Sequence, residues 1–166
     1  MKVPRAIALA LLWVGFAAYV WFSAAQLPER VATHFGVGGE PNGWMTRAGH
    51  VRFTLVAGVA IPAFVLGVFA LVRYCGDAGL NIPHKAYWLA PERRQETIAF
   101  IQRQGVWFAA VMIVFLAGLH RSIVAANVRS PVSLPPGEVG WVAGGLIASS
   151  LIWAACFFVR FSRKPA

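Results

Sequence analysis

The polar segment at residues 28–47 lies between two long apolar runs and holds the side chains best suited to chemistry. Its His34 and Glu40 are residue types that act as acid and base in catalysis. With His50 they could also bind Zn²⁺, but their spacing matches no zinc motif, and a closed zinc site needs four ligands. The sequence therefore predicts neither a metal nor another cofactor.

Glycines and aromatic residues give the same segment a shape. Pro41-Asn42-Gly43 predicts a tight turn, because Asn and Gly tolerate positive φ. We expect a small hairpin-like lid in which Trp44 is fixed relative to Phe35 and His34 hydrogen-bonds Glu40. The predicted site for a ligand or partner comprises His34, Phe35, Gly39, Glu40, Pro41, Asn42, Gly43 and Trp44.

Two further ionisable residues, His120 and Arg121, interrupt the third apolar run near its outer end. Ionisable groups in a membrane usually find partners, and the available outer carboxylates are Glu29, Glu40 and Glu138. The simpler interpretation is a pair that extends to the interface. The functional interpretation is that both residues support the outer-loop site.

A second polar segment, residues 73–103, carries an aromatic and basic motif. Tyr87 and Trp88 beside Lys85 predict an anchor at the membrane interface. Pro91 predicts the first residue of a helix, with Glu92 favourable to its dipole. The full motif comprises Pro83, Lys85, Tyr87, Trp88, Pro91, Glu92, Arg93 and Arg94.

Motifs that define enzyme classes are missing from the sequence. It contains no Ser-x-x-Lys, no G-x-S-x-G, no Walker loop and no H-E-x-x-H. Asp77 is the only Asp, so the chain cannot form a pair of intramembrane aspartates. We therefore expect a non-enzymatic protein without catalytic residues.

Four apolar runs supply the elements that hold these segments. The chain is 58% hydrophobic and 13% charged, whereas soluble domains carry about 25% charged residues. A helix of about 20 apolar residues spans the hydrocarbon core. We expect one all-α integral membrane domain over residues 1–166, with helices at about 6–27, 52–73, 100–126 and 139–160.

Two long loops connect these helices, a glycine-rich, structured outer loop at 28–51 and a cytoplasmic loop at 74–99. The first run could instead be a signal peptide cut after Ser23-Ala24-Ala25, but its length favours a retained helix. Cys75 and Cys156 both lie near predicted cytoplasmic ends, which argues against a structural disulfide.

The distribution of Lys and Arg predicts the orientation. Ten of the 15 basic residues fall on inner segments when the N-terminus is inside, and five on outer segments. The positive-inside rule then places both termini in the cytoplasm of a bacterial cell and the outer loop outside. The net charge of +9 thus indicates topology and lipid contact rather than a nucleic-acid partner. The inner residues are Lys2, Arg5, Arg73, Lys85, Arg93, Arg94, Arg103, Arg160, Arg163 and Lys164; the outer ones are Arg30, Arg47, Arg52, Arg121 and Arg129.

Two features predict how the helices pack. Pro62 removes a backbone hydrogen bond, and within a bundle a neighbouring helix can satisfy the freed carbonyl. Gly140, Gly144 and Ala148 form a small-xxx-small spacing, which lets helix backbones approach closely. We therefore expect Gly144→Leu to weaken the bundle.

Four short patterns carry a resemblance to a known family. Leu27-Pro28, His34-Phe35, Gly39-Glu40-Pro41 and Asn42-Gly43-Trp44 resemble a domain of unknown function in bacterial multi-pass membrane proteins, also found at the N-terminus of SdpI-type toxin-immunity proteins. The cytoplasmic motif resembles that of small, stand-alone members. The resemblance spans the first two helices and both loops.

The resemblance implies an immunity or sensor module that binds a peptide or toxin at the outer loop, besides its contact with the lipid bilayer. One alternative is a small transporter or a subunit of a larger membrane complex, including a homo-oligomer. The other is a lipid-active enzyme that uses His34 and Glu40 as acid and base.

Overall fold

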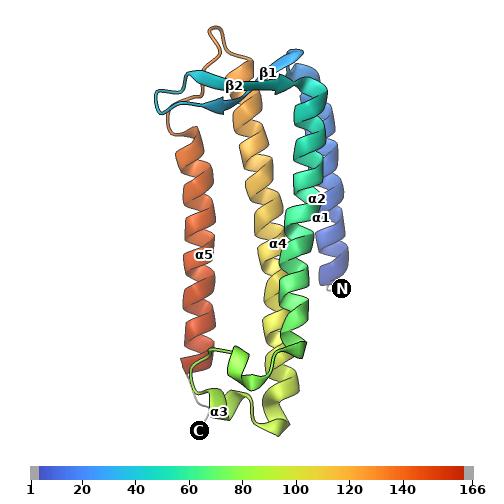
Figure 1. Ribbon diagram of the computed structural model, residues 1–166, viewed down its shortest axis with the longest axis vertical. Helices are drawn as coiled ribbons and strands as arrows, with labels where there is room; N and C mark the ends of the chain where they lie inside the picture. The colour runs from blue at the N-terminus through green and yellow to red at the C-terminus, as the bar shows by residue number, and fades with distance from the viewer. Residues whose placement is uncertain (1–3, 163–166) are drawn as a thin grey trace.

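The computed structural model describes residues 4–162, and four long helices make up most of it (Figure 1). They are α1 (Arg5–Ser23), α2 (Arg47–Leu71), α4 (Pro91–Asn127) and α5 (Glu138–Ser162). All four are long and apolar enough to cross a membrane, which confirms the expectation of four such helices. Three residues of the charge count, Lys2, Arg163 and Lys164, lie outside the described residues.

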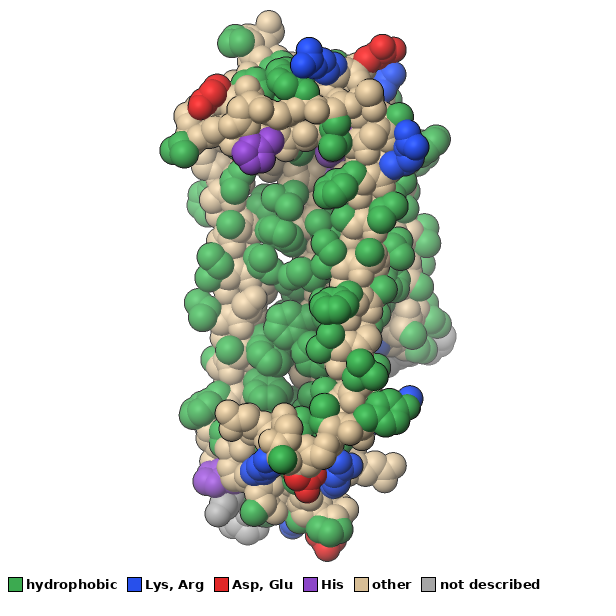
Figure 2. Space-filling view, viewed as in Figure 1, with side chains coloured by type: hydrophobic (Ala, Val, Ile, Leu, Met, Phe, Trp, Pro, Cys, Tyr) green, Lys and Arg blue, Asp and Glu red, His purple; other side chains and the backbone are tan. Residues whose placement is uncertain are grey.

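Helix α4 lies at the centre of the bundle and packs against α1, α2 and α5. Leu9, Phe16 and Val20 of α1 meet Ala109 and Ile113 of α4 in the buried core. In Figure 2, apolar side chains cover the helix shafts, and charged side chains gather at the two ends. A surface of this kind suits contact with the hydrocarbon of a bilayer and with water at either side.

Short elements connect the long helices. The 3₁₀ turn η1 (Ala24–Gln26) follows α1, and η2 (Val72–Tyr74), η3 (Asp77–Gly79) and α3 (Lys85–Trp88) lie between α2 and α4. Both ends of the described chain lie away from the η1 end of the bundle (Figure 1).

A two-stranded antiparallel sheet, β1 (Arg30–Phe35) and β2 (Pro41–Thr46), lies across the η1 end of the bundle (Figure 1). The fold is therefore mostly helical rather than all-α as expected, because it includes this β-hairpin. Val31 and Ala32 of β1 are buried, and Val31 packs against Val124 of α4. In β2, half-buried residues alternate with exposed ones, as in a strand with one face toward the helices and one toward solvent.

The turn of the hairpin is not where the sequence placed it. It lies at residues 36–40, where Gly39 has a φ of 84° and the Gly36 amide donates to the Glu40 carbonyl at 2.8 Å. Asn42 and Gly43 instead lie in β2, at an irregular register opposite His34. A Cβ on Gly43 would come 2.8 Å from the His34 Cβ, so this glycine permits close approach of two strands rather than a turn.

Two helices begin earlier than the apolar runs that predicted them. Helix α2 starts at Arg47, because the Thr46 hydroxyl caps it by accepting from the Gly49 amide at 3.1 Å. Helix α4 starts at Pro91 and continues through His120 and Arg121 to Asn127 without a break. Its 37 residues span about 55 Å at 1.5 Å per residue, more than the hydrocarbon core of about 30 Å.

Pro62 is fully buried in α2, and its effect on the helix is compensated as expected. Proline at position 62 leaves the carbonyl of Gly58 without its helical donor. The indole Nε1 of Trp13 in α1 donates to that oxygen at 2.8 Å. A neighbouring helix therefore satisfies the group that the proline frees.

Among the residues that the structure describes, the small-residue spacing of α5 makes no close contact with another helix, which corrects the packing prediction. A Cβ on Gly140 or Gly144 would meet no atom within 4 Å. The close approaches are at Gly58, where the Phe16 ring occupies the space, and at Gly105, where a Cβ would lie 2.6 Å from Phe69. The sequence spacing failed here because it does not reveal which helix face points to a neighbour.

Candidate functional site

The hairpin is fixed to the end of α4 by one buried side chain. The Asn127 Oδ1 accepts from the Ala32 amide at 2.8 Å, and its Nδ2 donates to the Ala32 carbonyl at 2.8 Å. The amide thereby pairs with β1 as a neighbouring strand would. Leu27, Val31 and Val124 form a buried apolar cluster beside this contact.

The glycine turn of the hairpin is fixed at a second point. The Leu134 amide, in the connection between α4 and α5, donates to the Gly39 carbonyl at 2.9 Å. A Cβ on Gly39 would lie 2.8 Å from the Leu134 carbonyl oxygen. Gly39 is therefore required for two reasons, its positive φ and the close approach of another backbone.

A cavity of about 600 Å³, named here the hairpin cavity, lies beneath the sheet. The hairpin contributes one wall, α2 and α4 contribute two others, and the residues around the start of α5 complete the lining. The walls are mostly apolar, and three histidines interrupt them. The lining residues are Thr33, His34, Phe35, Met45, His50, Phe53, Thr54, Ala57, Leu116, Leu119, His120, Ser122, Ile123, Leu134 and Val139.

A buried hydrogen-bonded chain joins three helices at the wall of this cavity. The His120 Nε2 lies 2.8 Å from the Ser23 Oγ, and the His120 Nδ1 lies 3.0 Å from the His50 Nε2. The two imidazole rings lie side by side and nearly parallel, with 5.2 Å between their centroids, and the Tyr19 ring meets His120 edge-on. His120 is only 2% exposed, so it faces the bundle rather than the interface, and the interfacial interpretation of this residue is wrong.

The direction of these hydrogen bonds follows from the single proton of the serine hydroxyl. The Ser23 Oγ lies 2.6 Å from the Tyr19 carbonyl oxygen, and two oxygens this close need a proton between them. Ser23 therefore donates to Tyr19 and accepts from the His120 Nε2–H. The His120 Nδ1 then accepts from the His50 Nε2–H, which assigns both neutral tautomers.

Two chemical consequences follow from this direction. A serine nucleophile directs its proton toward the imidazole that acts as its base, and Ser23 directs its proton away from His120. The remaining nitrogen of His50, Nδ1, is left as an acceptor. No protein partner occupies it among residues 4–162, and His50 lines the hairpin cavity. The site can thus accept a hydrogen bond from a ligand.

The predicted loop residues are divided between the two faces of the hairpin. His34 hydrogen-bonds the Asn42 side chain, and not Glu40 as expected. The Glu40 carboxylate folds back over the turn, where a Cβ on Gly38 would lie 2.6 Å from it. The irregular register at His34 explains the difference, because it places Asn42 beside the ring.

The two aromatic residues of the loop also differ in position. Phe35 is half-buried and lines the hairpin cavity. Trp44 is 41% exposed, and the Arg30 guanidinium lies 5.3 Å above its ring. Pro41 pairs with Phe35 at the end of the sheet. Trp44 therefore belongs to the outer surface of the hairpin and not to the wall of the cavity.

Arg121 points away from the buried histidines. Its guanidinium contacts the Glu138 carboxylate at 2.8 Å, and the Ser122 hydroxyl lies 3.3 Å from the same carboxylate. Of the three carboxylates considered from the sequence, Glu138 is the partner. The pair joins α4 to the first turn of α5 at the edge of the hairpin cavity.

The aromatic and basic motif lies at the other end of the bundle and packs against the end of α5. The Trp88 Nε1 donates to the Phe161 carbonyl at 2.9 Å, and the Arg93 guanidinium stacks on Tyr87 at 4.2 Å. Arg94 pairs with Asp77 at 3.2 Å. Pro91 and Glu92 lie in the first turn of α4. Pro83 lies in the turn before α3, and Lys85 is the first residue of α3. These contacts give the motif a role in joining α3, α4 and α5.

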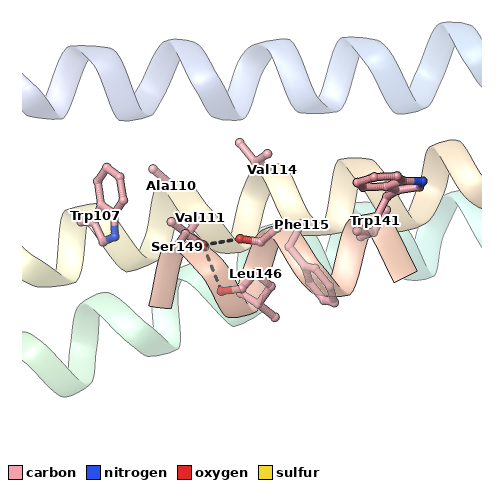
Figure 3. A pocket seen from close by; sticks show the side chains of 11 residues that line it. Trp107, Ala110, Val111, Val114, Phe115, Trp141, Leu146 and Ser149 are labelled. Carbon is pink, nitrogen blue, oxygen red and sulfur yellow. Dashed lines mark hydrogen bonds between the residues drawn. The ribbon is translucent and has the colours of Figure 1, made fainter. Parts of the chain in front are cut away.

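A second cavity, of about 450 Å³, lies between α4 and α5 (Figure 3). Trp107 and Trp141 stand at its opposite ends, with aliphatic side chains and Phe115 between them. The hydroxyl of Ser149 is directed to the carbonyls of Gly145 and Leu146 in its own helix. This second cavity has almost no free polar group that could hydrogen-bond a ligand, so the hairpin cavity is the better candidate for a specific ligand.

No three His, Cys, Asp or Glu side chains within residues 4–162 are grouped closely enough to hold a metal ion. His34, Glu40 and His50, considered from the sequence, do not converge. Two residues of the site, Ser23 and Asn127, carried no signal in the sequence. Each is the last residue of its helix, and only the packing of the helices and the hairpin supplies its partners.

Residues 6–58 match a domain of unknown function, DUF1648. The match covers α1, the hairpin and the first half of α2, and it includes Ser23 and His50 but not His120. This confirms the predicted resemblance for the first part of the chain.

Over 60 residues the chain is 43% identical to an uncharacterized protein of Archaeoglobus fulgidus. The aligned segment covers 36% of this chain and 30% of that protein, so the chain spans less than a third of the relative's length. No solved structure matches.

Proposed function

We propose that this protein is a non-enzymatic, multi-pass membrane protein that binds a ligand in the hairpin cavity. The observation that carries the proposal is the cavity itself, about 600 Å³ with apolar walls and a histidine acceptor. Ligand sites are typically clefts of roughly 300–1,000 Å³ with apolar walls and a few placed polar groups. The hairpin that covers the cavity is fixed at both Ala32 and Gly39.

The chemistry of the lining defines the ligand class. Phe35, Phe53 and Leu119 offer contacts to an apolar group, and the His50 Nδ1 offers one acceptor. A matching ligand has an apolar part and a hydrogen-bond donor at its end, as a hydrophobic segment of a peptide does. The resemblance to SdpI-type proteins favours a peptide toxin, and immunity is then the biological role.

The proposal places the hairpin on the outer side of a bacterial cytoplasmic membrane. The excess of Lys and Arg on the predicted inner segments supports this orientation. The test uses a variant without Cys75 and Cys156, both exposed and free, into which Asn42→Cys or Arg93→Cys is introduced. An impermeant maleimide applied to intact cells is expected to label position 42 and not position 93. Labelling of position 93 alone reverses the orientation and removes the outer-site proposal.

A catalytic role is disfavoured by the same contacts. Ser23 donates to a backbone carbonyl, and His34 is paired with Asn42 rather than Glu40. Neither arrangement supplies a general base beside a free nucleophile. The transporter alternative rested on Pro62 and the small-residue face of α5. Pro62 is compensated by Trp13, and that face has no helix partner within the described residues.

The functional test fills the cavity. Ala57→Phe places a ring in the hairpin cavity, whereas Ala60→Phe places the same ring on an exposed part of α2. Sensitive cells expressing each variant are challenged with secreted peptide toxins. We expect the wild type and Ala60→Phe to protect and Ala57→Phe to fail at equal membrane abundance. Equal protection by both variants would remove the cavity from the mechanism.

A further inference from the structure

A third groove, named here the arginine groove, lies between α1 and α4 and is separate from the hairpin cavity. Its volume is about 640 Å³. Arg5 and Arg103 lie in its lining, and the other lining side chains are almost all apolar. They are Ala8, Leu9, Leu12, Phe100, Gln104, Val106, Trp107 and Ala110.

The depth of the two arginines follows from the helix geometry. The hydrogen bond between Ser23 and His120 marks one common level on α1 and α4. Arg5 precedes Ser23 by 18 positions and Arg103 precedes His120 by 17, which correspond to about 27 Å and about 26 Å along the helices. Since the hydrocarbon core is about 30 Å thick, both guanidinium groups lie near the interface opposite the hairpin.

Within residues 4–162, no carboxylate neutralises the charges of the arginine groove. Neither Arg5 nor Arg103 forms an ion pair with a carboxylate within residues 4–162, where the ion pairs involve other arginines. The Arg103 guanidinium lies 5.9 Å above the Phe100 ring. Gln104, the remaining polar residue, is already bonded to Trp153 and to the Phe100 carbonyl. The lining thus presents two positive charges and no acidic group.

We propose that the arginine groove binds an anionic glycerophospholipid of the inner leaflet. The guanidinium groups of Arg5 and Arg103 hold the phosphate, because guanidinium matches phosphate oxygens with paired donors. An acyl chain lies along Leu9, Leu12 and Val106. A zwitterionic lipid is disfavoured, since its ammonium group would meet two like charges. The site is independent of the ligand proposed for the hairpin cavity.

Native mass spectrometry of the delipidated full-length protein tests the proposal. Phosphatidylglycerol and phosphatidylcholine with identical acyl chains are titrated separately. We expect phosphatidylglycerol to bind about tenfold more tightly. Arg5→Gln and Arg103→Gln should each reduce its affinity about fivefold, the effect expected of one basic residue near anionic lipid. Ala8→Phe, which fills the apolar part of the groove, should weaken binding without removing a charge.

The matched control is Arg52→Gln, an exposed arginine on α2 whose side chain hydrogen-bonds only the Ala48 carbonyl among residues 4–162. It removes the same charge elsewhere and should leave the preference for phosphatidylglycerol unchanged. If Arg52→Gln lowers affinity as much as Arg103→Gln, the effect is one of net charge and the proposal fails. Equal affinity for the two lipids also overturns it.

A competition experiment tests whether the groove binds the whole lipid or only its phosphate group. Glycerol 1-phosphate at millimolar concentration should not displace phosphatidylglycerol, because the acyl chain contributes to binding. Displacement by glycerol 1-phosphate would assign the arginines to a soluble phosphate and overturn the lipid assignment. Melting temperatures of all variants, expected to stay near the wild-type value, identify any loss caused by unfolding.

Discussion

Replacing Asn127 with Ala should release the hairpin from the bundle. The substitution removes both hydrogen bonds to the backbone of Ala32, which is 0% exposed and has no access to water. At about 1 kcal/mol for each hydrogen bond, docking weakens by about 2 kcal/mol. Since 1.4 kcal/mol is a factor of ten, the hairpin should open about 30 times more often.

Amide hydrogen exchange in detergent micelles measures this opening directly. Amides of β1 and β2 in Asn127→Ala should exchange about 30-fold faster than in the wild type. Asn127→Asp retains an acceptor for the Ala32 amide but places an oxygen against the Ala32 carbonyl. It should therefore loosen the hairpin at least as much as Ala does.

Asn42→Ala is the matched control, because Asn42 is exposed and its side chain bonds only His34 within the described part of the chain. Hairpin docking should be unchanged in this variant. If Asn127→Ala changes the exchange rates less than threefold, the amide bonds do not hold the hairpin. Docking then depends on the apolar cluster of Leu27, Val31 and Val124.

Three further predictions concern the bundle. Gly58→Leu should destabilise the protein by about 1–3 kcal/mol in an SDS unfolding titration, because its Cβ would enter the space of the Phe16 ring. Gly144→Leu should change stability by less than about 0.5 kcal/mol, and a larger loss would show that α5 meets a partner there. Trp13→Phe should cost about 1 kcal/mol in the wild type and less in Pro62→Ala, where a new amide can satisfy the Gly58 carbonyl. Equal costs in both backgrounds would contradict the compensation of Pro62 by Trp13.

The four helices long and apolar enough to cross a membrane could be predicted from the sequence, because this property depends on local composition. A run of about 20 apolar residues is sufficient evidence. The compensation of Pro62 was also predictable in kind, since a freed carbonyl in a bundle needs a donor. The identity of that donor, Trp13, required the packing of α1 on α2.

The histidine cluster could not be predicted from spacing. Ser23 lies 97 positions from His120, and His50 lies 70 positions from it. Only the packing of three helices brings them together. The turn at Asn42-Gly43 was a reasonable local prediction, but the contact between Gly39 and Leu134 fixes the turn three residues earlier. In each case a long-range contact decided between locally acceptable structures.

The central claim is that the hairpin cavity holds a ligand, and photocrosslinking from inside it is the most direct measurement. A benzophenone side chain replaces Met45, which lines the cavity, or Phe64, which is exposed on α2 outside it. In living cells we expect a discrete adduct at position 45 that Ala57→Phe abolishes and Ala60→Phe does not. Position 64 should give phospholipid adducts in every background. Identical phospholipid adducts at both positions, unaffected by Ala57→Phe, would contradict the claim that the hairpin cavity binds a specific ligand.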